Sequence, residues 1–293
     1  MAVATGTLSI TDNTFLNNTA SSSNQMPAGG AIYVSQDGTC RLTGNLFIDN
    51  QATGAGSGGG GLYLYTKAAT IENNFFAHNT ALMGGGMSGV LKPSASTWKL
   101  TNNTLWHNNA TGQHGGGGAY IGSYTDGATI TITNNIIRDN SSGGPGDDLR
   151  VDTDSDQNNT GTTVNLNYNL LGPHTSFASG HSDDLYITNT GNYHHHANGT
   201  DDPRLKTDGH LPSGSPAINK GICGRWFNDM QGHRFYYRTA PMDDRDGDPR
   251  PGTGATGGCD IGADEYRFPW PMFLPAIVRP HLNPYSIPVH PGF

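Results

Sequence analysis

The sequence predicts an all-β solenoid, a parallel β-helix with three short strands in each coil of about 30 residues. The first observation behind this prediction is a motif that occurs five times: an asparagine, two mostly apolar residues, and a second asparagine five positions after the first. Both sets of asparagines advance in steps of 32, 29, 29 and 32 residues. The first asparagines are Asn13, Asn45, Asn74, Asn103 and Asn135, and the second are Asn18, Asn50, Asn79, Asn108 and Asn140.

The second observation is composition. Only 34% of the residues are hydrophobic and 14% are charged, while 42 of the 293 are glycine. Disordered chains usually combine low hydrophobicity with high charge, which is absent here. A solenoid fits these values, because a core one side chain deep needs few apolar residues per coil.

The third observation is that each repeat divides into three short strand-like pieces. The first follows the glycines and alternates in character, so we expect Ile32, Val34, Leu62 and Leu64 to face the interior. The second is a triplet such as residues 8–10, and the third is the asparagine–apolar–apolar motif itself. Three short strands cannot form a sheet within one coil, so each must pair with its equivalent one coil along, about 4.8 Å away.

All ten motif asparagines are interpreted as structural rather than ligand-binding. Asparagine tolerates left-handed backbone angles, and stacked amides can hydrogen-bond along the axis as a ladder. The glycines allow sharp turns and close approach of the next coil.

Charge and hydropathy exclude several classes of protein. The net charge is −8 with only 16 lysines and arginines and no basic run, so nucleic-acid binding is not expected. No apolar stretch reaches transmembrane length. No signal peptide is visible at the N-terminus, so we expect that one was removed or that the chain begins inside a longer sequence.

The repeats resemble the polymorphic outer-membrane-protein repeat, which pairs a Gly-Gly-Ala-Ile element with Phe-x-x-Asn. Residues 29–32, 47–50 and 76–79 match that signature, and the resemblance covers residues 1–172. It implies a bacterial, extracellular or cell-surface, right-handed parallel β-helix, often an adhesin or a structural surface component.

The C-terminal third is similar to the end segment of secreted, surface-anchored β-helix proteins. Its landmarks are residues 202–205, 214–221, 246–251 and 259–266, in that order. The resemblance implies degenerate final coils over residues 173–222, a compact cap over 223–266, and no specific catalytic activity. Residues 267–293 then form a tail rich in proline and aromatic residues, in place of the usual anchor.

Cys223 and Cys259 flank the landmarks of the expected cap. In an exported protein this pair is expected to form a disulfide that closes the cap, leaving Cys40 free.

Two acidic clusters have a spacing that could present several carboxylates to Ca²⁺. The first contains Asp152, Asp154 and Asp156, and the second contains Asp246 and Asp248. The first lacks the glycine and the closing glutamate of a helix–loop–helix calcium site. Solvated or salt-bridged turns therefore compete with Ca²⁺ binding as the interpretation, and no other cofactor is expected.

Catalysis is not the favoured interpretation. Enzymes that cleave polysaccharides share this fold, and their hydrolases need paired carboxylates across a groove. The few charged residues of the repeats are scattered over five coils. A polysaccharide-binding or polysaccharide-degrading protein (lyase or hydrolase) stays as the alternative, with residues 147–156 as its best site.

The ends of the predicted solenoid point to self-association. The first coil has no cap before it, and an uncapped coil exposes unpaired backbone groups. The tail offers aromatic and apolar residues at Phe268, Trp270, Phe273 and Leu274. We therefore expect head-to-tail assembly into a filament. The alternative is a fragment of a larger adhesin whose tail folds back on its own coils, and a cell-surface polysaccharide is the other expected partner.

Overall fold

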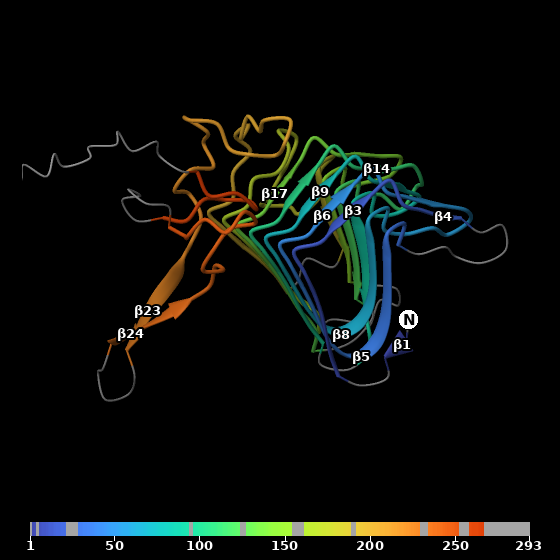
Figure 1. Cartoon of the computed structure of the whole chain (residues 1–293), viewed down its shortest axis with the longest axis horizontal. Helices are drawn as coiled ribbons and strands as arrows, with labels where there is room; N and C mark the ends of the chain where they lie inside the picture. Colours follow the sequence, from blue (N-terminus) through green and yellow to red (C-terminus); the bar gives the residue numbers. More distant parts are fainter. Residues whose placement is uncertain are drawn as a thin grey trace, which may run out of the picture.

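The computed structural model confirms the parallel β-helix (Figure 1). Its coils are numbered here by their first-ladder asparagine, so that Asn13 marks coil 1 and Asn169 marks coil 6. No helix occurs among the residues that the structure describes. These are residues 2–3, 6–21, 29–93, 96–123, 127–153, 161–188, 192–228, 234–251 and 258–266.

Three parallel sheets run along the solenoid, and the strands of each sheet come from successive coils. The largest sheet contains β1 (Ala2–Val3), β2 (Thr7–Thr11), β5 (Ile32–Thr43), β8 (Leu62–Glu72), β11 (Met87–Leu91), β12 (Thr97–Thr101), β15 (Ala119–Ser123), β16 (Thr129–Thr133), β19 (Leu149–Asp152), β20 (Thr163–Asn167), β21 (Leu185–Ile187) and β22 (Tyr193–His196). The second contains β3 (Thr14–Leu16), β6 (Leu46–Ile48), β9 (Phe75–Ala77), β13 (Thr104–Trp106) and β17 (Ile136–Arg138). The third contains β4 (Thr19–Ser21), β7 (Gln51–Thr53), β10 (Thr80–Ala81), β14 (Asn109–Ala110) and β18 (Ser141–Ser142).

The strands of a coil are divided differently from the prediction. The first two expected pieces belong to one sheet, and in β5 and β8 they form a single strand of 12 and 11 residues. The third strand follows the second asparagine, where only two or three residues are extended. Two or three residues are too few to show the alternation of apolar and polar side chains that identifies a strand. The sequence therefore did not reveal this third strand.

The core is a column of aliphatic and aromatic side chains stacked in register. Leu42, Ile71, Leu100, Ile132 and Leu166 occupy equivalent positions in successive coils and are fully buried. Each contributes about 1.5–3 kcal/mol on burial. Three of the four residues expected inside, Val34, Leu62 and Leu64, are buried. Ile32 is only partly buried.

The motif asparagines form two hydrogen-bonded ladders. In each step the backbone N–H and the Nδ2 group of one asparagine donate to Oδ1 of the asparagine one coil along, as Asn74 does to Asn103 at 3.0 Å in both bonds. The first ladder continues beyond the predicted copies to Asn169 and Asn198. The second ends at Asp148, whose Oδ1 accepts from the Nδ2 group of Asn140 at 2.9 Å.

The left-handed backbone angles belong to the residue before each ladder asparagine. That residue has a φ between 52° and 67° in both ladders. It is glycine in Gly44 and aspartate in Asp12 and Asp49, the residue types that tolerate this conformation best. The prediction had assigned both the left-handed backbone angles and the ladder hydrogen bonds to the ladder asparagines themselves.

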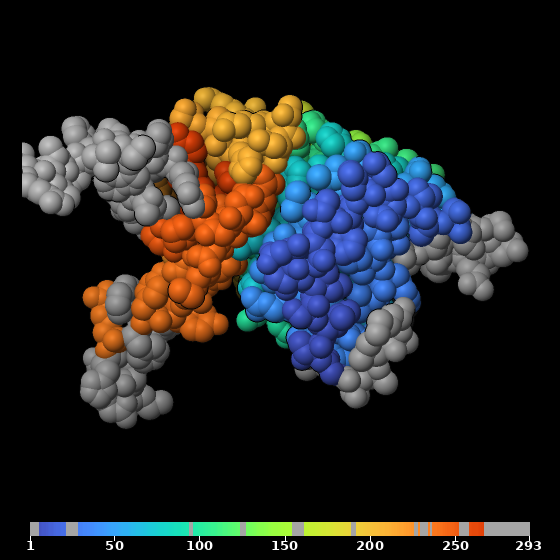
Figure 2. Space-filling model, in the orientation of Figure 1, coloured from blue at the N-terminus to red at the C-terminus, as the bar shows by residue number. Residues whose placement is uncertain are grey.

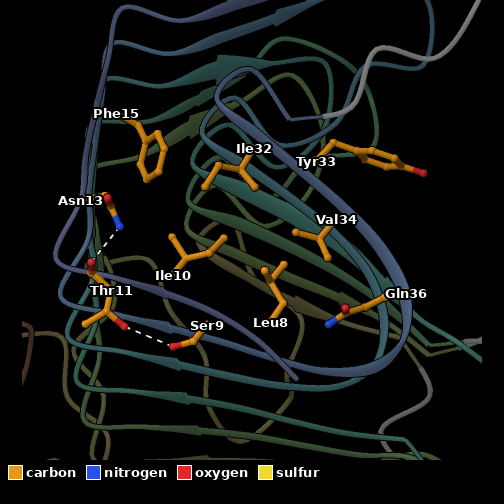
Figure 3. Close-up of a pocket in the computed structure, with 10 residues that line it drawn as sticks. All are labelled: Leu8, Ser9, Ile10, Thr11, Asn13, Phe15, Ile32, Tyr33, Val34 and Gln36. Carbon is orange, nitrogen blue, oxygen red and sulfur yellow. Dashed lines mark hydrogen bonds between the residues drawn. The ribbon is translucent and has the colours of Figure 1, made fainter. Parts of the chain in front are cut away.

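The two ends of the solenoid differ. In coil 1 the inward-facing Leu8, Ile10 and Phe15 are only partly buried, and they line an open mouth of about 600 Å³ (Figure 3). Oδ1 of Asn13 and of Asn18 accepts no hydrogen bond from a described residue.

At the far end, the outer edge of β21 is covered. His181 forms an antiparallel bridge with Tyr186 on the edge of β21 that faces away from β19, and the backbone N–H of Ile187 donates to Gly180. Phe177 packs against the core of the last coils. Residues 173–182 thus protect an edge that would otherwise be free to pair.

The C-terminal segment, residues 200–266, lies along the side of the solenoid rather than over its last coil. It is held by the asparagines that precede the ladder asparagines of coils 3, 4 and 5 and that point outward. The contacts run from Asn73 Nδ2 to the Asp243 carbonyl (2.6 Å), from Asn102 Nδ2 to the Asp260 carbonyl (2.9 Å), and from Asn134 Nδ2 to the Ile222 carbonyl (2.8 Å). Residues 223–266, expected as a cap on the final coils, therefore lie against the middle of the stack.

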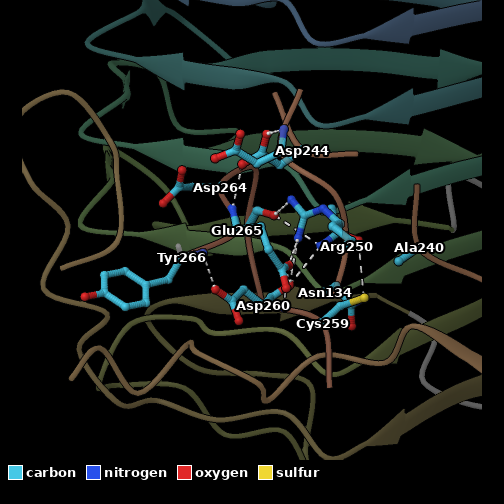
Figure 4. A network of polar contacts seen from close by, with 12 residues as sticks. Asn134, Ala240, Asp244, Arg250, Cys259, Asp260, Asp264, Glu265 and Tyr266 are labelled. Atoms are coloured by element: carbon cyan, nitrogen blue, oxygen red, sulfur yellow. Dashed lines mark hydrogen bonds and ion pairs between the residues drawn. The ribbon is translucent and has the colours of Figure 1, made fainter. Parts of the chain in front are cut away.

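A buried ion pair organises this segment (Figure 4). Arg250 Nη1 donates to Glu265 Oε2 at 2.9 Å, and both side chains are at most 1% exposed. Arg250 also donates to the carbonyls of Asp260 and Gly262. Burial, reinforced by the charge of Glu265, raises the pKa of Asp260 to about 7.

The disulfide between Cys223 and Cys259 joins the two halves of the segment, with their Cα atoms 5.1 Å apart. Cys40 is free and fully buried, and burial raises the pKa of its thiol to about 12. Its reactive thiolate form is therefore scarce at neutral pH.

Candidate ligand-binding groove

A two-stranded hairpin projects from the C-terminal segment beside the solenoid, and we call it the arm (Figure 1). It consists of β23 (Gly224–Asn228) and β24 (Arg234–Arg238), which pair antiparallel. An isolated hairpin is marginally stable in water, so its base needs support. The disulfide at Cys223 and the hydrogen bond from the Thr239 N–H to the Cys223 carbonyl (2.9 Å) provide it.

The arm and the solenoid enclose a groove of about 560 Å³ (Figure 2). The solenoid wall takes residues from coils 2 to 6, beginning at Arg41 and ending at Tyr168. Four coil steps of about 4.8 Å give this wall a length of about 19 Å along the axis. The groove can therefore accommodate an extended, chain-like ligand rather than a compact one.

A second hollow of about 520 Å³ continues the groove toward coil 1 and shares Arg41, Pro241 and Met242 with it. Its lining is acidic, with Asp12, Asp243, Asp244 and Asp246. Both oxygens of Asp244 already accept backbone N–H groups. The groove therefore has a distinct chemistry at each end.

Basic side chains line both walls of the groove, and we call the stretch from Glu72 in coil 3 to Tyr168 in coil 6 its basic half. Lys99 extends from the exposed face of β12, and Arg225 and Arg238 come from the arm. Glu72 is the sole carboxylate among the lining residues of this half, and it pairs with Arg41 at 2.7 Å.

Aromatic and apolar side chains form the remaining surface of the groove. Tyr168 has a left-handed φ of 56° that places it at the corner of coil 6, and its ring meets His196 edge-on at 5.4 Å. Tyr237 is 56% exposed and Met242 is 72% exposed on the opposite wall. Exposed large apolar side chains beside convergent polar groups are typical of a binding site.

A scan against protein-family models matches residues 2–192 to the right handed beta helix region. The chain belongs to the right-handed β-helix family. No curated protein and no solved structure matches it. Within the described part of this β-helix, no helix has the length and apolar character needed to span a membrane.

Of the acidic residues considered for Ca²⁺, the structure describes Asp152, Asp246 and Asp248. Asp152 pairs with Arg150 at 3.2 Å and accepts from the Thr188 hydroxyl. Asp154 and Asp156 lie outside the described residues. Ca²⁺ binding there stays a prediction.

Asp246 forms a cluster with His210 and Asp264, and Asp248 is not a member of that cluster. Within the described ranges, His210, Asp246 and Asp264 are the one group of potential ligands whose atoms lie within 4.8 Å of one another. His210 Nδ1 is already 2.8 Å from Asp264 Oδ1, and Arg245 Nε is 3.3 Å from Asp246 Oδ2. Calcium prefers oxygen ligands alone, so this mixed and internally paired cluster fits a contact between segments better than a calcium site.

The structure describes residues 147–153 of the acidic region considered for catalysis, and Asp148 is the buried carboxylate among them. Asp148 is 1% exposed, and burial raises its pKa well above the usual value, with the charge of Asp184 adding to the effect. Its oxygens accept from Asn140 and from the Gly172 N–H at 2.6 Å. Asp148 therefore terminates the second ladder and is not accessible to a substrate.

The groove itself was not predicted from the sequence. Its signal is visible afterwards in residues 224–238, where three arginines and five aromatic residues crowd a stretch of 15. The residues proposed for assembly, Phe268, Trp270, Phe273 and Leu274, lie outside the described part of the chain.

Proposed function

We propose that this β-helix is an extracellular structural or adhesive surface protein without catalytic activity, and that it holds a cell-surface polysaccharide in the groove beneath the arm. The observation that carries the proposal is the groove itself, about 19 Å long and lined by the exposed Tyr237, the half-buried Tyr168 and polar side chains from both walls. An extended polymer can lie parallel to the solenoid axis and contact each coil in turn.

Binding without cleavage is supported by the lining of the basic half. Hydrolysis of a glycosidic bond by the common mechanism requires two carboxyl groups on opposite sides of the bond. Glu72 is the one carboxylate that the described residues place there, and it is engaged by Arg41. The disulfide supports an oxidising, extracellular location.

A polysaccharide-binding assay with an aromatic variant tests this function. Tyr237→Ala is expected to weaken binding about 5–10-fold, because it removes an exposed ring from the groove wall. Biolayer interferometry against a panel of neutral and acidic polysaccharides measures the change, and reducing-end analysis of the same mixtures is expected to detect no cleavage.

Tyr33→Ala is the matched control, since Tyr33 is 46% exposed but lines the mouth of coil 1 instead. Absence of binding to every polysaccharide in the panel would contradict the proposal. Equal losses of affinity in the two tyrosine variants would also contradict the assignment of the binding site to the groove. Release of reducing ends would show that the protein hydrolyses the polysaccharide, against the proposal of binding alone.

Self-association is a second candidate, and the mouth of coil 1 favours it. Phe15 ends the stack formed with Phe47 and Phe76 there, and two ladder acceptors have no described donor. Leu16, on the outer face of the same coil, is 52% exposed. Because the outer edge of β21 is covered at the far end, the contact proposed is between the mouth and another surface, the tail included.

Leu16→Asp is expected to abolish self-association, because it replaces an exposed apolar side chain of coil 1 by a charge that a contact would bury. Deletion of residues 267–293 tests the tail separately. Light scattering and negative-stain microscopy of the two variants give the oligomeric state. Monomeric wild-type protein would eliminate this candidate, and unchanged assembly after the deletion would exclude the tail as the connector.

A further inference from the structure

We infer that the groove selects an anionic polysaccharide, one that carries carboxylate or sulfate groups along its chain. This inference rests on the proposed function and adds the charge of the ligand to it. It is carried by three basic side chains, from both walls, that line the basic half of the groove.

None of these three cations pairs with an acidic residue in the described part of the chain. Lys99 and Arg225 are exposed and form no ion pair with a described residue. Arg238 donates only to backbone carbonyls, those of Ala240 (3.1 Å), Pro241 (2.9 Å), Met242 and Arg250. The positive potential of this half is therefore not neutralised by neighbouring carboxylates.

Several basic residues elsewhere in the protein do form ion pairs, which are Lys92–Asp37, Arg138–Asp139, Arg150–Asp152, Arg245–Asp246 and Arg250–Glu265. Arg204, Lys206 and Lys220 form no ion pair with a described residue, but they do not line the groove. Lys99, Arg225 and Arg238 differ from them because they share one groove, whose single carboxylate among the described lining residues, Glu72, is engaged by Arg41. They therefore mark a surface that an external anion can complete.

The two walls contribute to the same patch. Lys99 comes from the solenoid, while Arg225 and Arg238 come from the arm. An anionic chain lying between them would receive charge-assisted hydrogen bonds from both sides, and arginine can bind a carboxylate or sulfate with two parallel donors.

The acidic end of the groove limits where the ligand lies. Asp12, Asp243 and Asp246 line the hollow beyond Arg41 and would repel an anionic polymer. The ligand is therefore restricted to the stretch from Glu72 to Tyr168. The tail is a poor competitor for this stretch, because residues 267–293 contain two arginines and no acidic residue.

The inference is tested with uronic-acid hexamers and the same hexamers after reduction of their carboxyl groups to alcohols. The full chain is expected to bind the acidic hexamer at least about tenfold more tightly than the reduced one at low salt. Because exposed charges are screened, the preference is expected to disappear in about 0.5 M NaCl. Isothermal titration calorimetry measures both affinities.

The double variant Lys99→Gln/Arg225→Gln is expected to lose about tenfold in affinity for the acidic hexamer and to retain its affinity for the reduced one. Lys220→Gln/Arg204→Gln is the matched control, with the same change of charge on exposed side chains outside the groove. It is expected to bind like the wild type.

The outcomes separate the two proposals. Equal, salt-independent binding of both hexamers, unaffected by the groove variant, would overturn the anionic selectivity and leave the polysaccharide-binding function standing. An equal loss in the control variant would show a non-specific effect of net charge and also overturn the inference. Absence of binding to either hexamer and to the wider polysaccharide panel would overturn the proposed function itself.

Discussion

Replacement of Asn79 by alanine is expected to lower the free energy of unfolding by about 4 kcal/mol, the cost of leaving several buried polar groups unpaired. Asn79 is fully buried. Its Oδ1 accepts the backbone N–H and the Nδ2 group of Asn50, both at 2.9 Å, and its own Nδ2 donates to Asn108 and to the Phe47 carbonyl. Alanine removes all four hydrogen bonds, and the groups that made them with Asn79 are too buried to form replacement hydrogen bonds with water.

Asn18→Ala is the matched control in the same ladder. Asn18 is exposed and its side chain only donates, to Asn50 Oδ1 and the Leu16 carbonyl. The expected cost is about 1 kcal/mol, the net value of an ordinary hydrogen bond. Urea unfolding followed by circular dichroism measures both variants. Equal destabilisation of the two would show that burial within the ladder does not determine the energetics.

Replacement of Arg250 by methionine is expected to detach the C-terminal segment while the coils stay folded. Breaking a buried ion pair by removing one partner costs about 3–5 kcal/mol, because the remaining charge stays buried. Here Glu265 would be left at 2% exposure, and the Asp260 and Gly262 carbonyls would each keep only the hydrogen bond from Asn102 Nδ2.

Hydrogen exchange with mass spectrometry distinguishes local detachment from global unfolding. Peptides covering 258–266 are expected to lose protection, and peptides covering β12 and β13 are expected to keep it. Arg204→Met, at an exposed arginine, is the control and is expected to change neither. Unchanged protection in 258–266 would contradict the role of Arg250, and simultaneous loss everywhere would mean that segment and solenoid unfold as one unit.

The periodic part of this fold could be predicted from the sequence because each coil repeats the same local requirements. The ladder asparagines and the inward Leu62 and Leu64 recur at fixed spacing, and pairing between equivalent strands follows from that spacing. The prediction was weaker at positions where the residue type is determined by a side chain of another strand.

Gly89 shows such a case. It occupies the position of Leu64 and Ile121 in the adjacent coils. A Cβ there would lie 2.3 Å from the ring of Trp98, which fills the core in place of the missing side chain. Exchange of volume between two strands cannot be deduced from either one alone.

The groove was beyond the reach of pattern analysis for a different reason. Its walls come from β5 to β20 on one side and from residues 222–242 on the other, and only the fold brings them together. The Asn73–Asn74, Asn102–Asn103 and Asn134–Asn135 pairs do mark the docking positions. The repeat spacing identifies the second asparagine of each pair as the ladder residue, but it does not indicate which segment the first asparagine binds.

The attachment of the C-terminal segment to coils 3, 4 and 5 has a mechanical consequence. A polymer pulled out of the groove transmits its load through Asn73, Asn102 and Asn134 to the middle of the stack. Every strand there is paired on both sides, so the force is shared among several coils as shear. The open mouth at coil 1, where the terminal strands would separate from the solenoid most easily, carries none of that load.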